Sequence, residues 1–278
     1  MDAQAVIDEE RRISELYAAD YRCNTLTNSY PYQLERRQFA DWVIATLVDA
    51  GLDPRELRAL DVGCGSGEIL ELLRNRGMGR LTGLDLSAGM IAEARRHLPE
   101  AEFYLGEIDR QPDVGGPVQV VTAAFLVHHL QRPRSFFELV GRVLAPGGWF
   151  FILDYNRASW SRKPVVRDLL LAPTLPARAL LKMKNRGALS KLARVPALFN
   201  PAHRLLSCGE VQAAIPQPAD YEVRVVTHGL WLASLKHSLD AGSSFDRRLT
   251  RAVSRLERLV VPARAGHFQW VAGRRRSA

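Results

Sequence analysis

The sequence predicts an α/β fold with a doubly wound, mostly parallel sheet. Short apolar runs alternate with amphipathic segments of helical spacing over the first 154 residues. This alternation is typical of parallel strands joined by right-handed helical crossovers, which place helices on both faces of the sheet. A chain of 278 residues, 47% of them hydrophobic, can also bury the core that such a fold needs.

The expected elements follow in order along the chain. Two amphipathic helices come first, over residues 7–20 and 32–50, and Gly51 and Pro54 end the second. Five buried strands are then expected at residues 57–62, 80–84, 102–105, 118–124 and 149–153. Helices are expected between them at residues 68–76, 88–98 and 133–144.

The chain beyond Asp154 is basic and breaks this rhythm. Residues 151–278 hold 22 lysines and arginines against 8 aspartates and glutamates. Residues 157–200 contain 4 prolines and are expected to form short basic helices, so residues 157–218 are interpreted as a helical cap insertion after the fifth strand. Two last strands are expected at residues 221–226 and 268–271, with a helix at 245–260 between them.

The composition also excludes several classes of protein. Apolar runs such as residues 120–127 are far shorter than the roughly 20 residues of a membrane-spanning helix. Residues 1–12 are acidic and polar, unlike a secretory signal, so a cytoplasmic location is expected. The 3 cysteines are widely spaced, which predicts reduced thiols and no metal site.

The most specific motif is the segment ALDVGCGSGE at residues 59–68. An apolar strand ends in Asp61 and leads through Gly63, Gly65 and Gly67 to the start of a helix. The glycines allow a tight turn and a close approach of a ligand to the backbone, and the Asp61 carboxylate can accept hydrogen bonds from an ammonium group. The third glycine comes one residue too early for a dinucleotide fingerprint, and the lysine of a phosphate-binding loop is missing.

Residues 59–154 resemble the class I S-adenosylmethionine-dependent methyltransferases in the order of several motifs. After the glycine-rich segment come LDLS at 84–87, GEID at 106–109, VTAAFLVHHL at 121–130 and the turn LAPGGW at 144–149. The resemblance implies a seven-stranded sheet with a reversed final hairpin and S-adenosyl-L-methionine as the cofactor. It also implies an amino-terminal helical lid over residues 1–52, a cofactor-binding core over 53–156 and a return to the core over 219–278.

The resemblance further assigns residues to parts of the cofactor. Asp61 and the three glycines would hold its amino-acid part. Asp85, followed by Leu86, would hold the two ribose hydroxyls, because one carboxylate can accept both hydrogen bonds.

At the adenine end, the resemblance places Glu107 near the amino group and the Ile108 amide against the ring. Relatives usually have an aspartate in the place of Glu107, so Asp109 is an alternative. Ala124 lies in the fourth-strand segment that passes the sulfonium.

The candidate catalytic residues are His129, His203 and Tyr21. His129 could remove a proton near neutral pH, or it could, like His128, have only a packing or capping role. His203 is a second candidate base. The Tyr21 ring, on the expected lid, could stabilise a developing cation.

The sequence thus predicts methyl transfer to a small hydrophobic acceptor, such as a natural product or a lipid-like molecule. Whether oxygen, nitrogen or carbon is methylated stays open. The alternative is a nucleic-acid methyltransferase that uses the basic second half, although no RNA-binding motif is present, and a third hypothesis is a non-catalytic binding protein. The basic cap is also compatible with contact to an anionic membrane surface, and the amino-terminal helix with a homodimer.

Overall fold

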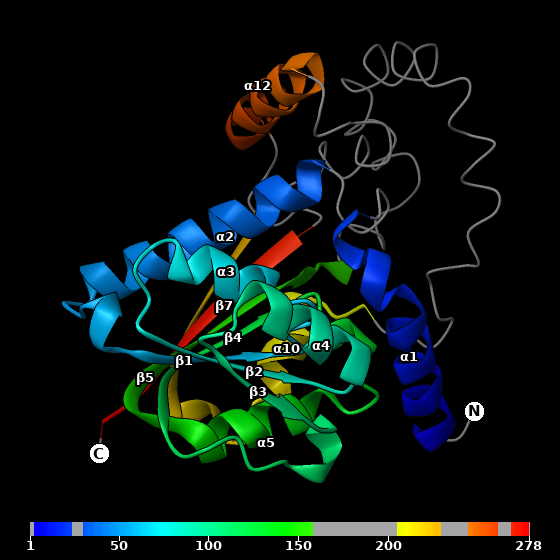
Figure 1. Cartoon of the computed structure of the whole chain (residues 1–278). Coiled ribbons are helices and arrows are strands. Elements are labelled where there is room, and N and C mark those ends of the chain that lie inside the picture. Colours follow the sequence, from blue (N-terminus) through cyan, green and yellow to red (C-terminus); the bar gives the residue numbers. More distant parts are fainter. Residues whose placement is uncertain (1–2, 24–29, 158–204, 229–243, 261–267, 278) are drawn as a thin grey trace.

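A seven-stranded sheet forms the centre of the protein. The computed structural model describes residues 3–23, 30–157, 205–228, 244–260 and 268–277 (Figure 1). In chain order the strands are β1 (Arg58–Val62), β2 (Arg80–Asp85), β3 (Glu102–Leu105), β4 (Val118–Ala124), β5 (Leu144–Tyr155), β6 (Tyr221–His228) and β7 (Phe268–Arg275). Their order in the sheet is β3-β2-β1-β4-β5-β7-β6. Strands β1 to β5 pair in parallel and β7 runs antiparallel to β5 and β6, which confirms the predicted reversed hairpin.

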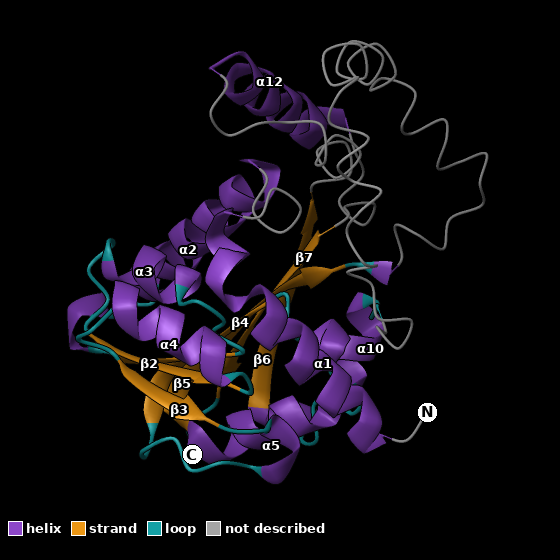
Figure 2. Cartoon of the chain, turned by 45° about the vertical axis from the view of Figure 1, so that its right-hand side comes forward, coloured by secondary structure: helices purple, strands orange, loops and turns teal. Residues whose placement is uncertain are grey.

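Helices cover both faces of this sheet (Figures 1 and 2). One apolar core lies under α2 (Tyr30–Asp49), α3 (Glu68–Arg74) and α4 (Ala88–His97). A second core lies under α5 (Pro133–Val143) and α10 (Cys208–Ala213) on the opposite face. The doubly wound arrangement predicted from the alternating pattern is therefore confirmed. Helix α12 (Ser244–Val260) contacts α2.

The first helix ends earlier than the sequence pattern predicts. Instead of one helix over residues 7–20, α1 spans Ala3–Tyr17 and a 3₁₀ segment, η1, spans Ala18–Cys23. The tighter winding of a 3₁₀ segment turns the chain, so Tyr21 does not continue the face of α1. The predicted carboxyl-terminal boundary of this helix is therefore wrong. The change of helix type after Tyr17 determines where Tyr21 lies.

Strand β5 is longer than predicted because it absorbs the turn expected at residues 144–149. Leu144 already pairs with Val118, and the next pair is Trp149 with Val120. The pairing of β5 with β4 is therefore irregular between Leu144 and Trp149. Gly147, in this stretch, has a positive φ of 74°. At the other end the strand continues to Tyr155, which brings Asp154 and Tyr155 to the carboxyl edge of the sheet.

The final residues of the predicted cap insertion pack into the core. Leu206 forms a bridge with Asn156, and Leu206, Val211 and Ile215 are buried. The remainder of that insertion, residues 158–204, lies outside the described residues, and so does the candidate base His203. Within the described ranges, none of the helices combines the length and the apolar character that crossing a membrane requires.

Candidate functional site

The glycine-rich segment forms an open loop between β1 and α3. Gly63, Gly65 and Gly67 all have positive φ, at 70°, 50° and 83°, a region that disfavours other residues. A side chain at Gly63 would also approach the Leu126 side chain to 2.6 Å. A Cβ at Gly65 would meet nothing within 4 Å. The backbone at Gly65 therefore faces free space, which a ligand can occupy.

Asp85 ties this loop to the end of β2. One carboxylate oxygen accepts a hydrogen bond from the Gly65 amide at 2.8 Å, and the other accepts from the Ser87 amide at 2.9 Å. Burial raises the pKa of Asp85, while these amides oppose the shift. Each oxygen keeps a further lone pair, so the same carboxylate can still accept bonds from ligand hydroxyls. Leu86 follows directly, past the end of β2.

Asp61 is a second buried carboxylate in the same region. It accepts a hydrogen bond of 2.7 Å from the Thr122 hydroxyl on the neighbouring strand β4. Burial raises the pKa of Asp61 to about 7; the Thr122 bond lowers it and the charge of Asp85 raises it further. A cation beside this pair of acids would relieve both the burial cost and the repulsion. The position suits an ammonium group.

The two acidic residues after β3 have different surroundings. Glu107 forms ion pairs with Arg11 of α1 and with Arg110. Asp109 has a buried oxygen, Oδ1, with no hydrogen-bond partner among the described residues. A buried acceptor without a partner is costly and suits a ligand that brings an N–H donor. The two acids thus differ: Glu107 is engaged by two arginines, whereas Asp109 carries a buried oxygen without a partner among the described residues, and Ile108 lies between them.

The amino-terminal segment crosses the carboxyl edge of the sheet. Side chains of α1 and η1 reach the segments that follow β1, β2, β3 and β4. The four pairs are Arg22 with the Ser66 carbonyl, Glu15 with the Gly89 amide, Arg11 with Glu107, and Glu10 with His129. This placement supports the predicted lid, which covers the loops expected to bind the cofactor.

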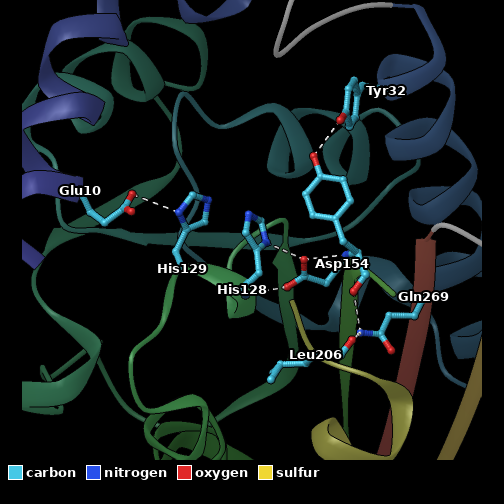
Figure 3. A network of polar contacts seen from close by, with 8 residues as sticks. Glu10, Tyr32, His128, His129, Asp154, Leu206 and Gln269 are labelled. Carbon is cyan, nitrogen blue, oxygen red and sulfur yellow. Dashed lines mark hydrogen bonds and ion pairs between the residues drawn. The ribbon is translucent and has the colours of Figure 1, made fainter. Parts of the chain in front are cut away.

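Two adjacent histidines after β4 have separate carboxylate partners (Figure 3). His128 is buried, and its Nδ1 lies 2.6 Å from Oδ1 of Asp154. The His128 backbone amide also donates to Asp154 Oδ2 at 3.0 Å. His129 Nδ1 lies 3.1 Å from Oε2 of Glu10, and its side chain is 32% exposed. The packing role left open at the sequence level therefore fits His128, while His129 remains accessible.

An aromatic cluster lies beside the histidines. The Phe125 ring, next to Ala124 at the end of β4, packs against Tyr32, Tyr155 and Phe268. The hydroxyls of Tyr32 and Tyr155 are 2.8 Å apart. Phe125 has a φ of 56°, which is uncommon for a bulky residue and is found mostly where function constrains the backbone. The sequence reasoning missed Tyr32 and Tyr155; the position of Tyr155 directly after a strand end was the available signal.

Tyr21 is linked to this aromatic cluster through Arg36, whose guanidinium lies over the Phe125 ring. It is half-buried and hydrogen-bonds with Arg36, and the charges of Glu68 and Asp85 act on it. Burial raises its pKa above the ordinary tyrosine value. The structure therefore groups Tyr21 with the glycine loop and α3, whereas His129 lies at the end of β4.

Comparisons with known proteins agree with this geometry. Residues 60–152 match the protein family described as "Methyltransferase domain". A demethylmenaquinone methyltransferase of Chlorobaculum parvum is 32% identical over 117 residues, which are 42% of this chain and 47% of the relative. A ubiquinone biosynthesis O-methyltransferase of Marinobacter nauticus is 33% identical over 107 residues, which are 36% and 44% of the two chains. The chain thus spans about half the length of these curated relatives.

The fold also matches a solved structure over nearly its whole length. The plantazolicin methyltransferase BpumL, solved in complex with SAH, has a TM-score of 0.56 and 15% identity, covering 96% of this chain and 97% of that one. The glycine-rich loop, the sheet order and the family match converge on one assignment. Residues 60–152 match a methyltransferase domain, and they lie in a sheet with the strand order and reversed final hairpin that the resemblance to class I S-adenosylmethionine-dependent methyltransferases implies.

Proposed function

We propose that this protein transfers the methyl group of S-adenosyl-L-methionine to a small hydrophobic acceptor. The observation that carries the proposal is the carboxyl edge of the sheet. There, an open glycine loop lies between the buried acids Asp61 and Asp85, and α1 crosses the neighbouring loops. Such an edge is where open α/β sheets bind their ligands.

The residues present fit this cofactor along its length. Asp61 and the backbone around Gly65 would hold its amino-acid part, Asp85 its ribose and Asp109 its adenine amino group. When bound, the cofactor supplies a methyl group that is already electrophilic because it is attached to a sulfonium. The task left to the protein is to align the acceptor with this methyl group and to exclude water, which α1 and the aromatic cluster favour.

The surroundings of Phe125 support an apolar, flat acceptor. Tyr32, Tyr155 and Phe268 present rings beside Phe125, and aromatic faces bind planar apolar groups well. The two relatives described above are named for demethylmenaquinone and for ubiquinone biosynthesis, which agrees with such an acceptor. The nucleic-acid alternative gains no support from the comparisons.

The first test is cofactor binding, measured by isothermal titration of the full chain with S-adenosylhomocysteine. The change is Gly65→Val, which places a side chain in the space that the loop leaves open. We expect the affinity to fall at least ~100-fold, equivalent to ~3 kcal/mol. The matched control is Gly116→Val, because Gly116 also has a positive φ, of 80°, and an open surrounding, but precedes β4 at the opposite edge.

Both substitutions carry a similar backbone strain of about 1–2 kcal/mol, so their melting temperatures should fall together. Equal loss of binding in both variants, or binding retained by Gly65→Val, would contradict the loop assignment. Mass spectrometry then tests catalysis: incubation with the cofactor and a panel of quinols, phenols and apolar amines should add one methyl group to an acceptor. Methylation of RNA under the same conditions would instead support the alternative of a nucleic-acid methyltransferase.

A further inference from the structure

We propose that Glu10, on the amino-terminal helix α1, is a positioning residue for His129, which removes the proton from a hydroxyl group of the acceptor. The inference rests on the proposed function and narrows the methylated atom to oxygen. Glu10 and His129 are 119 residues apart in the chain, so only the docking of α1 on the sheet edge joins them (Figure 3).

The contact fixes which nitrogen of His129 carries the proton. An ionised carboxylate can only accept, so Nδ1, at 3.1 Å from Glu10 Oε2, must donate its N–H. In a neutral imidazole the other nitrogen, Nε2, then keeps its lone pair and is a proton acceptor. Glu10 is 9% exposed, which reduces the competition from water for this bond.

The neighbouring histidine shows why His129 is the better candidate. His128 has the same kind of contact, from Nδ1 to Asp154, but its side chain is only 7% exposed against 32% for His129. The ring centroids of the two histidines are 4.0 Å apart, so the His128 ring packs against the His129 ring and limits its movement. His129 is thus held from two sides and still reachable.

The proposed step is balanced for a hydroxyl acceptor. The O–H bond breaks and its proton forms a new N–H bond at Nε2 of His129. The electron pair of that oxygen enters the bond to the transferred methyl carbon, and the pair of the former C–S bond stays on the sulfur. The imidazolium that results is stabilised by the Glu10 carboxylate, and it releases its proton to solvent when the product leaves.

The location of Glu10 also couples alignment of the base to closure of the site. The same helix carries Arg11, which pairs with Glu107, and Glu15, which accepts from the Gly89 amide. When α1 lies across the loops expected to bind the cofactor, Glu10 meets His129. When α1 is displaced, His129 loses the contact that fixes its tautomer. Proton removal is therefore restricted to the covered site.

The test is ¹⁵N NMR of the full chain with labelled histidine, without added ligand, so it does not depend on activity. The His129 signals are assigned with the variant His129→Gln. In the wild type we expect a protonated Nδ1 and an unprotonated Nε2. Glu10→Ala should shift His129 toward a mixture of tautomers, and Glu10→Gln, whose side-chain oxygen can still accept, should restore the Nδ1–H form.

The matched control is Glu15→Ala, which removes another α1 carboxylate that contacts the core but does not touch His129. It should leave the His129 signals unchanged, and the His128 signals should stay constant in every variant as a measure of correct folding. A wild-type His129 protonated on Nε2, or signals that Glu10→Ala does not move, would overturn the proposal. Loss of the Nδ1–H form in Glu15→Ala as well would show that docking of α1, and not the Glu10 carboxylate, sets the tautomer.

A kinetic arm uses the acceptor found by mass spectrometry. Glu10→Ala should lower kcat about 10- to 100-fold, with the KM for the acceptor changed far less, because general-base catalysis contributes about 100-fold or more. Glu10→Gln should recover part of the rate. An unchanged kcat in Glu10→Ala, or an acceptor methylated on carbon, would overturn the inference. Failure of S-adenosylhomocysteine to bind the wild type would instead reject the proposed function and leave the tautomer result standing.

Discussion

Two groups of carboxylates meet at the carboxyl edge of the sheet, and they differ in what holds them. Asp61, Asp85 and Asp154 stand at strand ends, are buried and bond to neighbouring strands or to their own loops. Glu10 and Glu15 stand on α1 and reach residues far away in the chain. The first group belongs to the fold itself, whereas the second group is in place only while α1 is docked.

The difference indicates that the acids at the strand ends are preformed, whereas the cover over both ends of the site depends on the docking of α1. The described contacts of α1 include partly exposed ion pairs such as Arg11 with Glu107, and such pairs contribute about 0–1 kcal/mol each. These ion pairs oppose a displacement of α1 only weakly, while the buried Val6 and Glu10 of the same helix contribute more to holding it. Three changes test this distinction.

Asp154→Ala should be the most destabilising of the three. The Asp154 carboxylate accepts from the His128 ring, the His128 amide and the Tyr155 amide. Its removal leaves buried donors without an acceptor, so we expect a loss of about 3–5 kcal/mol in the free energy of unfolding, measured in urea. Asp154→Asn keeps one acceptor oxygen and should lose less. If Asp154→Ala lowered the free energy of unfolding by less than ~1 kcal/mol, Asp154 would resemble the weakly held carboxylates of α1 instead.

Asp61→Asn should change how stability depends on pH. The pKa of Asp61 is about 7 in the folded protein against a normal value of 3.8. Between these values the unfolded chain has lost the proton that the folded protein still holds, so the wild type loses stability as the pH rises from 4 to 7. Relative to Asp61→Asn the loss can reach about 4 kcal/mol, at ~1.4 kcal/mol per pKa unit. Urea titrations of both proteins at several pH values measure the difference in their free energies of unfolding. If this difference did not change with pH, Asp61 would be ionised in the folded protein throughout this pH range.

Glu15→Gln should have the smallest effect. A neutral side-chain oxygen can still accept from the Gly89 amide, so we expect a stability change below about 1 kcal/mol. The docked form of α1 should remain the major one but open more often, visible as faster hydrogen exchange of its amides with no change in β1 to β5. Protection lost from both regions together would show that α1 and the sheet unfold as one unit, against the distinction drawn above.

The strands and the glycine loop could be predicted from sequence because local patterns determine them. The range predicted for the fourth strand, 118–124, coincides with β4, and the alternation of strands and helices sufficed for the doubly wound sheet. The contact of Glu10 could not be predicted, because Asp8, Glu9 and Glu10 are consecutive acids and only the docking of α1 distinguishes them. The orientation of Tyr21 could not be predicted for a related reason: the change from α-helix to 3₁₀ helix after Tyr17 turns it toward Arg36, and its catalytic role stays a prediction.

One contact links the beginning of the chain to its end. Glu35 on α2 accepts a hydrogen bond of 2.7 Å from the indole nitrogen of Trp270 on β7, across 235 residues. During synthesis α2 leaves the ribosome long before β7, so this hydrogen bond of the buried Glu35 carboxylate can form only after β7 has been made. The packing of Tyr32 against Phe268 of the same strand likewise requires β7, so the aromatic cluster beside the histidines is completed only when the last described strand is added.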